Sequence, residues 1–320
     1  MGEFELIERY FAAVGASRRD TLLGVGDDAA VLAVPPGHDL VACTDTLVAG
    51  RHFPAGFDAA DIGWRALAVN LSDLAAMGAT PAWATLALTL PELDEDWLEG
   101  FVTGFAALAN PQQVALVGGD TTKGPLTLTV QALGTVPHGT ALRRHGAKPG
   151  DLVYVTGWPG DAAAGLELIA GRLAGSGANR GALELKFRRP EPRVAFGARL
   201  RGIASACIDV SDGLAADLGR LAAASGVAAI VRATELPLSR ALYALAGETR
   251  AREFALGGGD DYELLFTVPK AARAALAQLT GSPGAPACHC IGDIAAGRGV
   301  RVVGEQGDLR VPRGWDHFAT

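Results

Sequence analysis

Five short aspartate motifs recur along this chain, each placed among glycine, alanine, serine or threonine. They are Gly26-Asp27-Asp28, Thr44-Asp45-Thr46, Asn70-Leu71-Ser72-Asp73, Gly118-Gly119-Asp120-Thr121 and Ile208-Asp209-Val210-Ser211-Asp212-Gly213. Hydrophobic runs surround several of them, and a carboxylate held there needs a compensating partner. The chain has only four lysines, and none lies inside a motif. Divalent cations are the natural candidates, because magnesium is commonly bound by one or two carboxylates together with substrate phosphates.

A bland alternative exists for each motif taken alone. A single Gly-Asp or Asp-Gly pair is ordinarily a turn. Asp73 is harder to explain that way, because it lies in the strongly apolar stretch 64–77; its alternative is a buried hydrogen bond to backbone amides. Asn70 and Asp73 are three residues apart on an expected helix, so they share a face and could reach one ligand together.

Known nucleotide-binding motifs are absent from the sequence. No G-x-x-x-x-G-K-[ST] stretch occurs, which excludes a P-loop. The glycine loop, H-R-D and D-F-G set of protein kinases is missing as well. Any phosphoryl transfer by this chain must therefore use another scaffold.

Composition limits the class of protein. A chain of 320 residues, 49% hydrophobic and 20% charged, fits two folded domains. A net charge of -7 without a lysine-rich run argues against nucleic-acid binding. No stretch has the apolar length of a membrane span, and the acidic start is unlike a signal peptide, so a cytoplasmic protein is expected. Cys288 and Cys290 do not have the spacing of a zinc ligand pair.

The elements that must position the motifs follow from periodicity. A helix is expected over 3–14, and a strand, turn and strand over 29–43 would present Thr44-Asp45. Asp73 falls in a helix expected over 61–77. Further strands are expected over 82–90, 114–117 and 126–133, with a helix over 97–109.

The second half also alternates strands and helices. A strand over 152–156 leads into an alanine-rich helix ending near residue 173, and a Gly-, Arg- and Pro-rich loop is expected over 175–192. The Asp209 to Asp212 motif is predicted to be the turn between a strand over 205–208 and a helix reaching 224. Later elements are a strand over 228–231, a helix over 239–245, a strand over 262–268, a helix from Pro269 and two terminal strands.

Residues 136–150 lose periodicity and gather Pro, Gly, His and three basic residues. We therefore place a linker at 138–150, between domains at 1–137 and 151–320. Mixed strands and helices in both halves predict an α+β fold of two mixed α/β domains.

With these residues in view, the chain resembles the thiamine-monophosphate kinases, a family in the superfamily of aminoimidazole ribonucleotide synthetase and selenophosphate synthetase. The resemblance runs nearly end to end. It rests on segments 24–28, 44–53, 66–78, 118–122, 147–151, 208–214 and 258–264. His52 and the ending Gly314-Trp315-Asp316-His317-Phe318-Ala319 point to the thiamine enzymes within the superfamily.

The resemblance implies roles for individual residues. Its implied metal ligands are Asp28, Cys43, Thr44, Asp45, Asp73, Asp120, Asp209 and Asp212. Relatives often have Ser at the position of Cys43, which leaves side-chain ligation there open and a backbone carbonyl possible. The implied ATP contacts are Gly119, Asp120, Arg144 and Ser211. The implied thiamine-phosphate contacts are His52, Asp260 and Trp315, although many relatives have Glu at the position of Asp260.

The activity implied is direct in-line transfer of the ATP γ-phosphoryl group to thiamine monophosphate, giving thiamine diphosphate, with several Mg²⁺ ions. The resemblance further implies an ATP- and Mg-binding N-terminal domain that pairs in a homodimer, and a C-terminal domain that contributes metal and substrate contacts. No residue is expected to act covalently or as an acid or base. The alternatives are another ATP-using superfamily member with a ribonucleotide or selenide substrate, a metal-dependent phosphohydrolase, and a non-catalytic nucleotide sensor.

Overall fold

The computed structural model describes residues 2–315 and contains two compact units. Unit 1 comprises the chain up to Leu74 together with Ala79–Gly139, and unit 2 comprises Ala75–Gly78 and the chain from Thr140 onward. Both units combine a mixed sheet with helices, as an α+β chain should. Within residues 2–315, no helix has both the length and the apolar character needed to cross a membrane.

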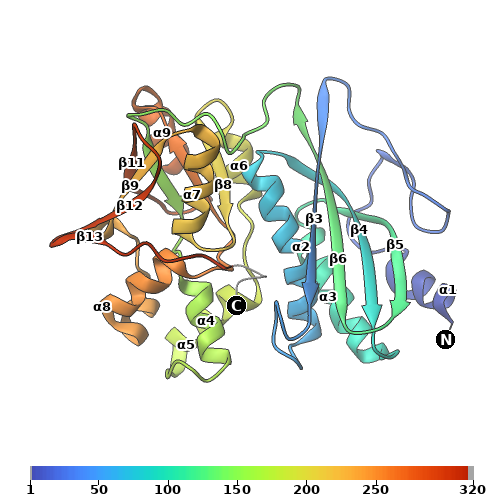
Figure 1. Cartoon of the computed structure of the whole chain (residues 1–320). Coiled ribbons are helices and arrows are strands. Elements are labelled where there is room, and N and C mark those ends of the chain that lie inside the picture. Colours follow the sequence, from blue (N-terminus) through green and yellow to red (C-terminus); the bar gives the residue numbers. More distant parts are fainter. Residues whose placement is uncertain (1, 316–320) are drawn as a thin grey trace. The chain divides into compact units, whose positions relative to one another are not determined.

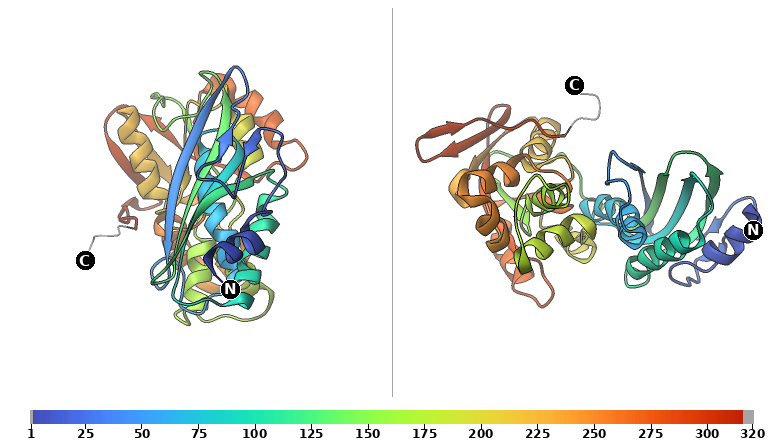
Figure 2. Two further views of the ribbon diagram at one scale, coloured as in Figure 1. Left: turned by 90° about the vertical axis from the view of Figure 1, so that its right-hand side faces the viewer. Right: turned by 90° about the horizontal axis from the view of Figure 1, so that it is seen from below.

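Unit 1 is a four-stranded sheet with two helices. The strand order is β3 (His38–Val48), β6 (Thr127–Pro137), β4 (Thr80–Leu90) and β5 (Ala115–Lys123). The β4 and β5 pair is parallel, and the other pairs are antiparallel. Helices α2 (Ala59–Ala76) and α3 (Glu95–Ala109) lie on one face of this sheet (Figures 1 and 2).

Glycine allows these two helices to pack very closely. A Cβ atom at Gly104 of α3 would lie 1.8 Å from the carbonyl oxygen of Ala60 in α2, and one at Gly63 would lie 2.0 Å from that of Phe101. No side chain fits at such distances, so the two backbones approach one another only because both positions are glycine. Asp94 begins α3 by accepting the N–H of Trp97 at 3.0 Å.

The start of the chain differs from the helix expected over 3–14. Helix α1 (Glu3–Leu6) continues as a π-helical turn, η1 (Ile7–Phe11), in which Ala12 N–H donates to the Ile7 carbonyl at 3.1 Å. The expected end at residue 14 was therefore wrong. The short strands β1 (Thr21–Leu23) and β2 (Val31–Leu32) then form a two-stranded ribbon.

Unit 2 contains a seven-stranded sheet. Its order is β13 (Gly307–Leu309), β12 (Gly299–Gly304), β9 (Ala228–Arg232), β11 (Cys288–Ala295), β7 (Leu152–Thr156), β10 (Glu263–Val268) and β8 (Ala206–Val210). Only the β12 and β9 pair is parallel. Because β7 and β8 both run antiparallel to β10, they point the same way. Asp209 of β8 pairs with Leu264 of β10, and Val155, the residue before Thr156 in β7, pairs with the next residue, Leu265.

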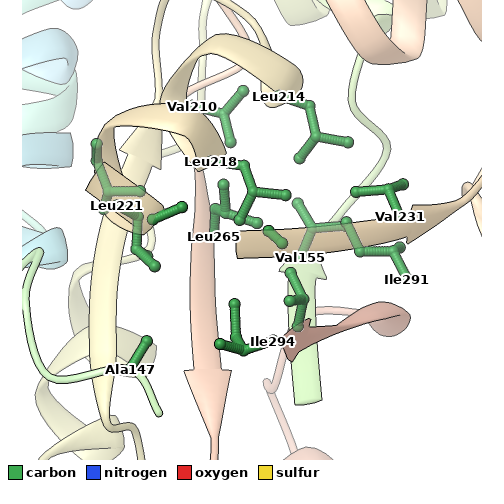
Figure 3. Close-up of a cluster of buried hydrophobic side chains, with 14 of the residues drawn as sticks. Ala147, Val155, Val210, Leu214, Leu218, Leu221, Val231, Leu265, Ile291 and Ile294 are labelled. Carbon is green, nitrogen blue, oxygen red and sulfur yellow. The ribbon is translucent and has the colours of Figure 1, made fainter. Parts of the chain in front are cut away.

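Helix α7 (Leu214–Ser225) packs on one face of this sheet. Leu214, Leu218 and Leu221 of α7 meet Val155 and Leu265 of the central strands in one buried cluster (Figure 3). These leucines follow the three- and four-residue spacing of one helix face, while the strand residues come from alternate positions. The core therefore fixes where α7, and the turn that precedes it, begin.

The remaining helices of unit 2 include two that were not expected, over 177–188 and 194–200. They are α4 (Asp161–Ile169), α5 (Gly177–Arg188), α6 (Val194–Leu200), α8 (Arg240–Gly257, kinked at Gly247) and α9 (Arg273–Thr280), with 3₁₀ turns at Ala233–Glu235 and Lys270–Ala272. The loop expected over 175–192 was thus wrong. Leu183 and Phe187 of α5 are fully buried, and the tertiary contacts that α5 makes with α4 and α8 outweigh its poor local pattern.

Candidate functional site

A pocket in unit 1 brings two of the acidic motifs together. Its volume is about 330 Å³, and it is lined by the motif at 26–28 and by the motif at 118–121 on β5. The lining residues are Ile7, Phe11, Val25, Gly26, Asp27, Asp28, Leu86, Leu116, Gly118, Gly119, Asp120 and Thr121. The pocket thus has an apolar wall from η1 and a carboxylate wall, and no lysine or arginine is among these lining residues.

Gly119 is required by the sheet beneath this pocket. A Cβ atom there would lie 1.9 Å from the carbonyl oxygen of Leu86 on the paired strand β4. The backbone of β5 can pair with β4 at this point only without a side chain. The next residue, Asp120, is exposed and carries the carboxylate that lines the pocket.

A second group in unit 1 forms where β3 passes α2. Cys43 and Asp45 lie on the same face of β3, two residues apart, and Asn70 of α2 contacts both. Its side-chain oxygen accepts the N–H of Asp45 at 3.1 Å, and its main-chain oxygen accepts the thiol of Cys43 at 3.3 Å. Asp73 is half-buried one helical turn farther along α2.

Thr44 lies between these residues in sequence but not in space. Successive side chains of a strand point to opposite faces, so the side chain of Thr44 points away from those of Cys43 and Asp45. Its hydroxyl instead accepts the side-chain N–H of Gln131 on β6 at 3.5 Å. Side chains of Thr44 and Asp45 cannot serve one ion together, although a main-chain carbonyl of Thr44 could.

His52 follows β3 in a tight turn. The N–H of Val48 donates to its Nδ1 at 2.9 Å, and the His52 N–H donates to the Val48 carbonyl at 2.9 Å. Because a main-chain N–H can only donate, Nδ1 must be the unprotonated nitrogen and a neutral His52 carries its proton on Nε2. His52 therefore offers Nε2–H as a donor.

No ready-made metal cage exists in the described chain. Across residues 2–315, no three His, Cys, Asp or Glu side chains come close enough together to hold a metal ion. Magnesium usually keeps several waters and takes only one or two protein carboxylates alongside phosphate oxygens. The predicted ligands in unit 1 are open carboxylates of this kind.

In unit 2 the predicted residues gather at one turn. Asp209 is buried at the last residue but one of strand β8, and Ser211 and Asp212 follow the strand before α7. The main chain of this turn is bonded to two other segments. The Asp260 N–H donates to the Ser211 carbonyl at 2.9 Å, and the Trp315 N–H donates to the Asp212 carbonyl at 3.0 Å. Asp260 and Trp315, both predicted to contact the substrate, thus lie beside Ser211 and Asp212.

The segment that carries Asp260 has an unusual backbone. Asp260 has φ 69° and Tyr262 has φ 52°, in the left-handed region that residues with side chains rarely adopt. Asp261 between them is buried and accepts N–H groups of Gly160 (2.7 Å) and Ala162 (3.2 Å) at the start of α4. Burial raises the pKa of Asp261 well above its ordinary value. Such non-glycine strain is common at functional sites.

Arg144 lies apart from this turn. Its carbonyl accepts the hydroxyl of Ser225 at 3.3 Å, at the last residue of α7, and the neighbouring Arg143 carbonyl accepts the Cys207 N–H at 2.8 Å. Ser211 lies at the other end of the same helix, three residues before its first residue, Leu214. Twelve residues of α-helix span about 18 Å, so the structure does not bring the main chains of Arg144 and Ser211 together.

Two buried carboxylates near these turns were not among the predicted residues. Asp217 accepts the N–H groups of Ser211 (3.1 Å) and Asp212 (3.0 Å), and burial raises its pKa to about 6 although Arg220 favours its charged form. Asp261 was quoted within a motif but given no role. Only spacing could have revealed Asp217, since it lies about one helical turn after the motif.

The chain was compared with known proteins. Residues 26–136 match the family AIR synthase related protein, N-terminal domain, and residues 148–305 match AIR synthase related protein, C-terminal domain. The thiamine-monophosphate kinase of Salmonella typhimurium is 51% identical over 322 aligned positions, covering 100% of this chain and 99% of that protein. The chain belongs to the thiamine-monophosphate kinase family. The resemblance seen in the sequence is thereby confirmed.

Solved structures of the thiamine-monophosphate kinase family share the fold. That of thiamine-monophosphate kinase from Stenotrophomonas maltophilia K279a has a TM-score of 0.85 and 54% identity, covering 89% of this chain and 92% of that one. A structure of AaThiL complexed with AMPPCP and TMP has a TM-score of 0.80 and 34% identity, with 92% of each chain covered. The expected two-domain fold of this superfamily is confirmed.

Proposed function

We propose that this chain transfers the γ-phosphoryl group of ATP to thiamine monophosphate, giving thiamine diphosphate. The observation that carries the proposal is the 51% identity to a thiamine-monophosphate kinase along the whole chain. AaThiL, which binds AMPPCP and TMP together, supports both a nucleotide and a thiamine phosphate as ligands. The acidic turns described above supply the site chemistry.

The acceptor needs little chemical activation. Its phosphate monoester has a second pKa near 6 and is mostly ionised at neutral pH, so no general base is required. Two polyanions must instead be held in line, and positioning with charge neutralisation provides most of the catalysis. Carboxylates that hold cations can do that work.

Magnesium is the cation that we propose, and the donors fit it. Asp28 and Asp120 line one pocket with hard oxygen ligands and no basic side chain among the lining residues. We propose that they hold magnesium in unit 1 with Cys43, Thr44, Asp45 and Asp73, and that Asp209 and Asp212 do so in unit 2. When bound, the ions neutralise phosphate charge. Turnover should stop in EDTA and return with added magnesium; turnover that persists in EDTA would contradict this.

The nucleotide and the acceptor are assigned to different residues. Gly119 and Asp120 on the pocket wall, with Arg144 and Ser211, are the proposed ATP contacts. Arg144 can bind a phosphate through two parallel N–H groups. For thiamine monophosphate we propose His52, which offers Nε2–H, together with Asp260 and the half-exposed ring of Trp315. An indole ring can stack on the cationic thiazolium.

We also propose that unit 1 forms a homodimer. Apolar side chains of its first 40 residues are exposed: Leu22 (66%), Val31 (49%) and Leu40 (49%). A partner chain that covered them would remove this apolar surface from water. Light scattering should give twice the chain mass, and Leu40→Glu should shift it toward the monomer. A monomeric wild-type protein would refute the dimer while leaving the activity untouched.

One assay tests the function directly. The protein is incubated with Mg²⁺, ATP and thiamine monophosphate, and the products are separated. Thiamine diphosphate formed in step with ADP supports the proposal. ADP release that ignores thiamine monophosphate would indicate a phosphohydrolase, and nucleotide binding without any product would indicate a sensor. If neither thiamine diphosphate nor ADP forms with thiamine monophosphate, but ATP is consumed with a ribonucleotide or selenide, the chain is another ATP-using enzyme of the superfamily.

A further inference from the structure

The turn from Asp209 to Gly213 carries more of the proposed site than any other segment of unit 2. Its Ser211 and Asp212 carbonyls receive the N–H groups of Asp260 and Trp315. Three proposed ligand contacts and one proposed metal ligand therefore depend on the conformation of two peptide groups. What holds those peptide groups decides how well the site is formed before any ligand arrives.

The N–H groups of the same two residues, Ser211 and Asp212, are held by one carboxylate. Asp217 lies in the first turn of α7 with its side chain 1% exposed, and its Oδ2 accepts the N–H of Ser211 at 3.1 Å and that of Asp212 at 3.0 Å. The side chain thus reaches back over the start of its own helix. Without Asp217, both partly buried N–H groups would lose a charged acceptor.

The other oxygen of Asp217 is anchored by Arg220. One guanidinium nitrogen, Nη1, contacts Oδ1 of Asp217 and also lies 2.6 Å from Oδ2 of Asp212. Arg220 is one helical turn from Asp217 and its side chain is 44% exposed. Arg220 therefore forms ion pairs with both the buried Asp217 and Asp212 in the turn.

We infer that Asp217 is a positioning residue for the proposed phosphoryl transfer, holding Ser211 and Asp212, and through them Asp260 and Trp315, with Arg220 fixing its orientation. Asp217 touches neither substrate nor the reacting atoms in this role. The inference rests on the proposed function for its kinetic consequence only. The hydrogen bonds that carry it do not depend on that function.

Amide hydrogen exchange of the ligand-free protein gives the direct test. In Asp217→Ala, the amides of Ser211 and Asp212 should exchange at least tenfold faster than in the wild type. In Leu221→Ala, which removes a buried side chain one helical turn farther along α7 and leaves the Asp217 hydrogen bonds in place, they should not. Equal exchange of these amides in wild type and Asp217→Ala, or equal acceleration in Leu221→Ala, would overturn the inference.

Kinetics give the second test. Asp217→Ala should lose at least tenfold in kcat/KM for thiamine monophosphate, because small displacements of a site cost rate steeply. Leu221→Ala should lose stability but keep kcat/KM within about threefold of wild type. The same kinetic loss in both variants would reduce Asp217 to a stabilising residue. A wild type without kinase activity would instead refute the proposed function and leave the exchange result standing.

A further pair of variants separates the acceptor from its charge. Arg220→Met keeps both Asp217 hydrogen bonds to the turn and should retain most of the amide protection. Asp217→Asn in the Arg220→Met background keeps an oxygen for the same N–H groups, so its exchange should match Arg220→Met alone. This double variant also covers the case in which Asp217→Ala does not fold. Loss of protection in it would overturn the acceptor role.

Discussion

Replacing Arg193 by Met should destabilise unit 2 strongly. Glu263 begins β10 with only 6% of its side chain exposed, and Arg193 donates to both of its oxygens at 2.7 and 2.6 Å. Glu263 also accepts the hydroxyl of Thr156 at 2.6 Å. Burial alone lowers the pKa of Arg193, but the hydrogen bonds and charge of Glu263 outweigh it and the net shift is upward. The pair is therefore tightly coupled.

The magnitude follows from what remains after the substitution. Removing one partner of a buried ion pair leaves an uncompensated charge and costs about 3–5 kcal/mol. The second ion pair of Arg193, with the 68% exposed Glu191, adds at most about 1 kcal/mol. For a unit of this size, a loss of about 4 kcal/mol lowers the melting temperature by roughly 8–16 °C. Scanning calorimetry and urea unfolding of the full chain measure both quantities.

Two variants make this prediction specific. Arg193→Met with Glu263→Gln removes the buried charge while keeping the bond from Thr156, so it should recover at least half of the lost free energy of unfolding. Arg172→Met provides the matched control, because two nitrogens of Arg172 also donate to one carboxylate, that of Glu167, but Arg172 is 60% exposed. This variant should lose less than about 1 kcal/mol of the free energy of unfolding. A loss below 1 kcal/mol in Arg193→Met, or a double variant no better than the single one, would refute the reasoning.

Three further predictions concern other parts of the chain. Burial raises the pKa of Asp161 to about 6, so the folded state holds its proton more tightly than the unfolded state; this stabilisation is complete below about pH 4 and is lost as the pH rises through 6. Asp161→Asn should therefore gain up to about 3 kcal/mol on the wild type between pH 4 and pH 7, and identical urea midpoints across that range would contradict it. Gly104→Ala should cost about 1–3 kcal/mol because its Cβ would overlap the Ala60 carbonyl; an unchanged melting temperature would count against the close helix contact. Asp120→Asn should lower kcat/KM roughly 100-fold at an unchanged unfolding midpoint, and full activity at saturating magnesium would remove Asp120 from the site.

The acidic turns were predictable because local sequence specifies them. Glycine beside aspartate favours a turn, as at 26–28 and 212–213, although Gly119-Asp120 lies within strand β5. The strand over 152–156 and the helix after Gly213 follow from periodicity within a few residues. The helix α5 was missed for the opposite reason. Its sequence has glycine, arginine and a weak apolar pattern, and it becomes a helix because Leu183 and Phe187 are buried against its neighbours. No local signal carries that information.

By itself, then, the sequence determined which residues are candidates for holding phosphate and metal, since side-chain chemistry and turn propensity are local properties. The tertiary structure decided how those residues are held. The strand pleat turns Thr44 away from Asp45, Val48 fixes the tautomer of His52, and Asp217 reaches back to bind the amides of Ser211 and Asp212. Each of these depends on where separate stretches of backbone meet, because a hydrogen bond forms only between groups that folding has brought within about 3 Å.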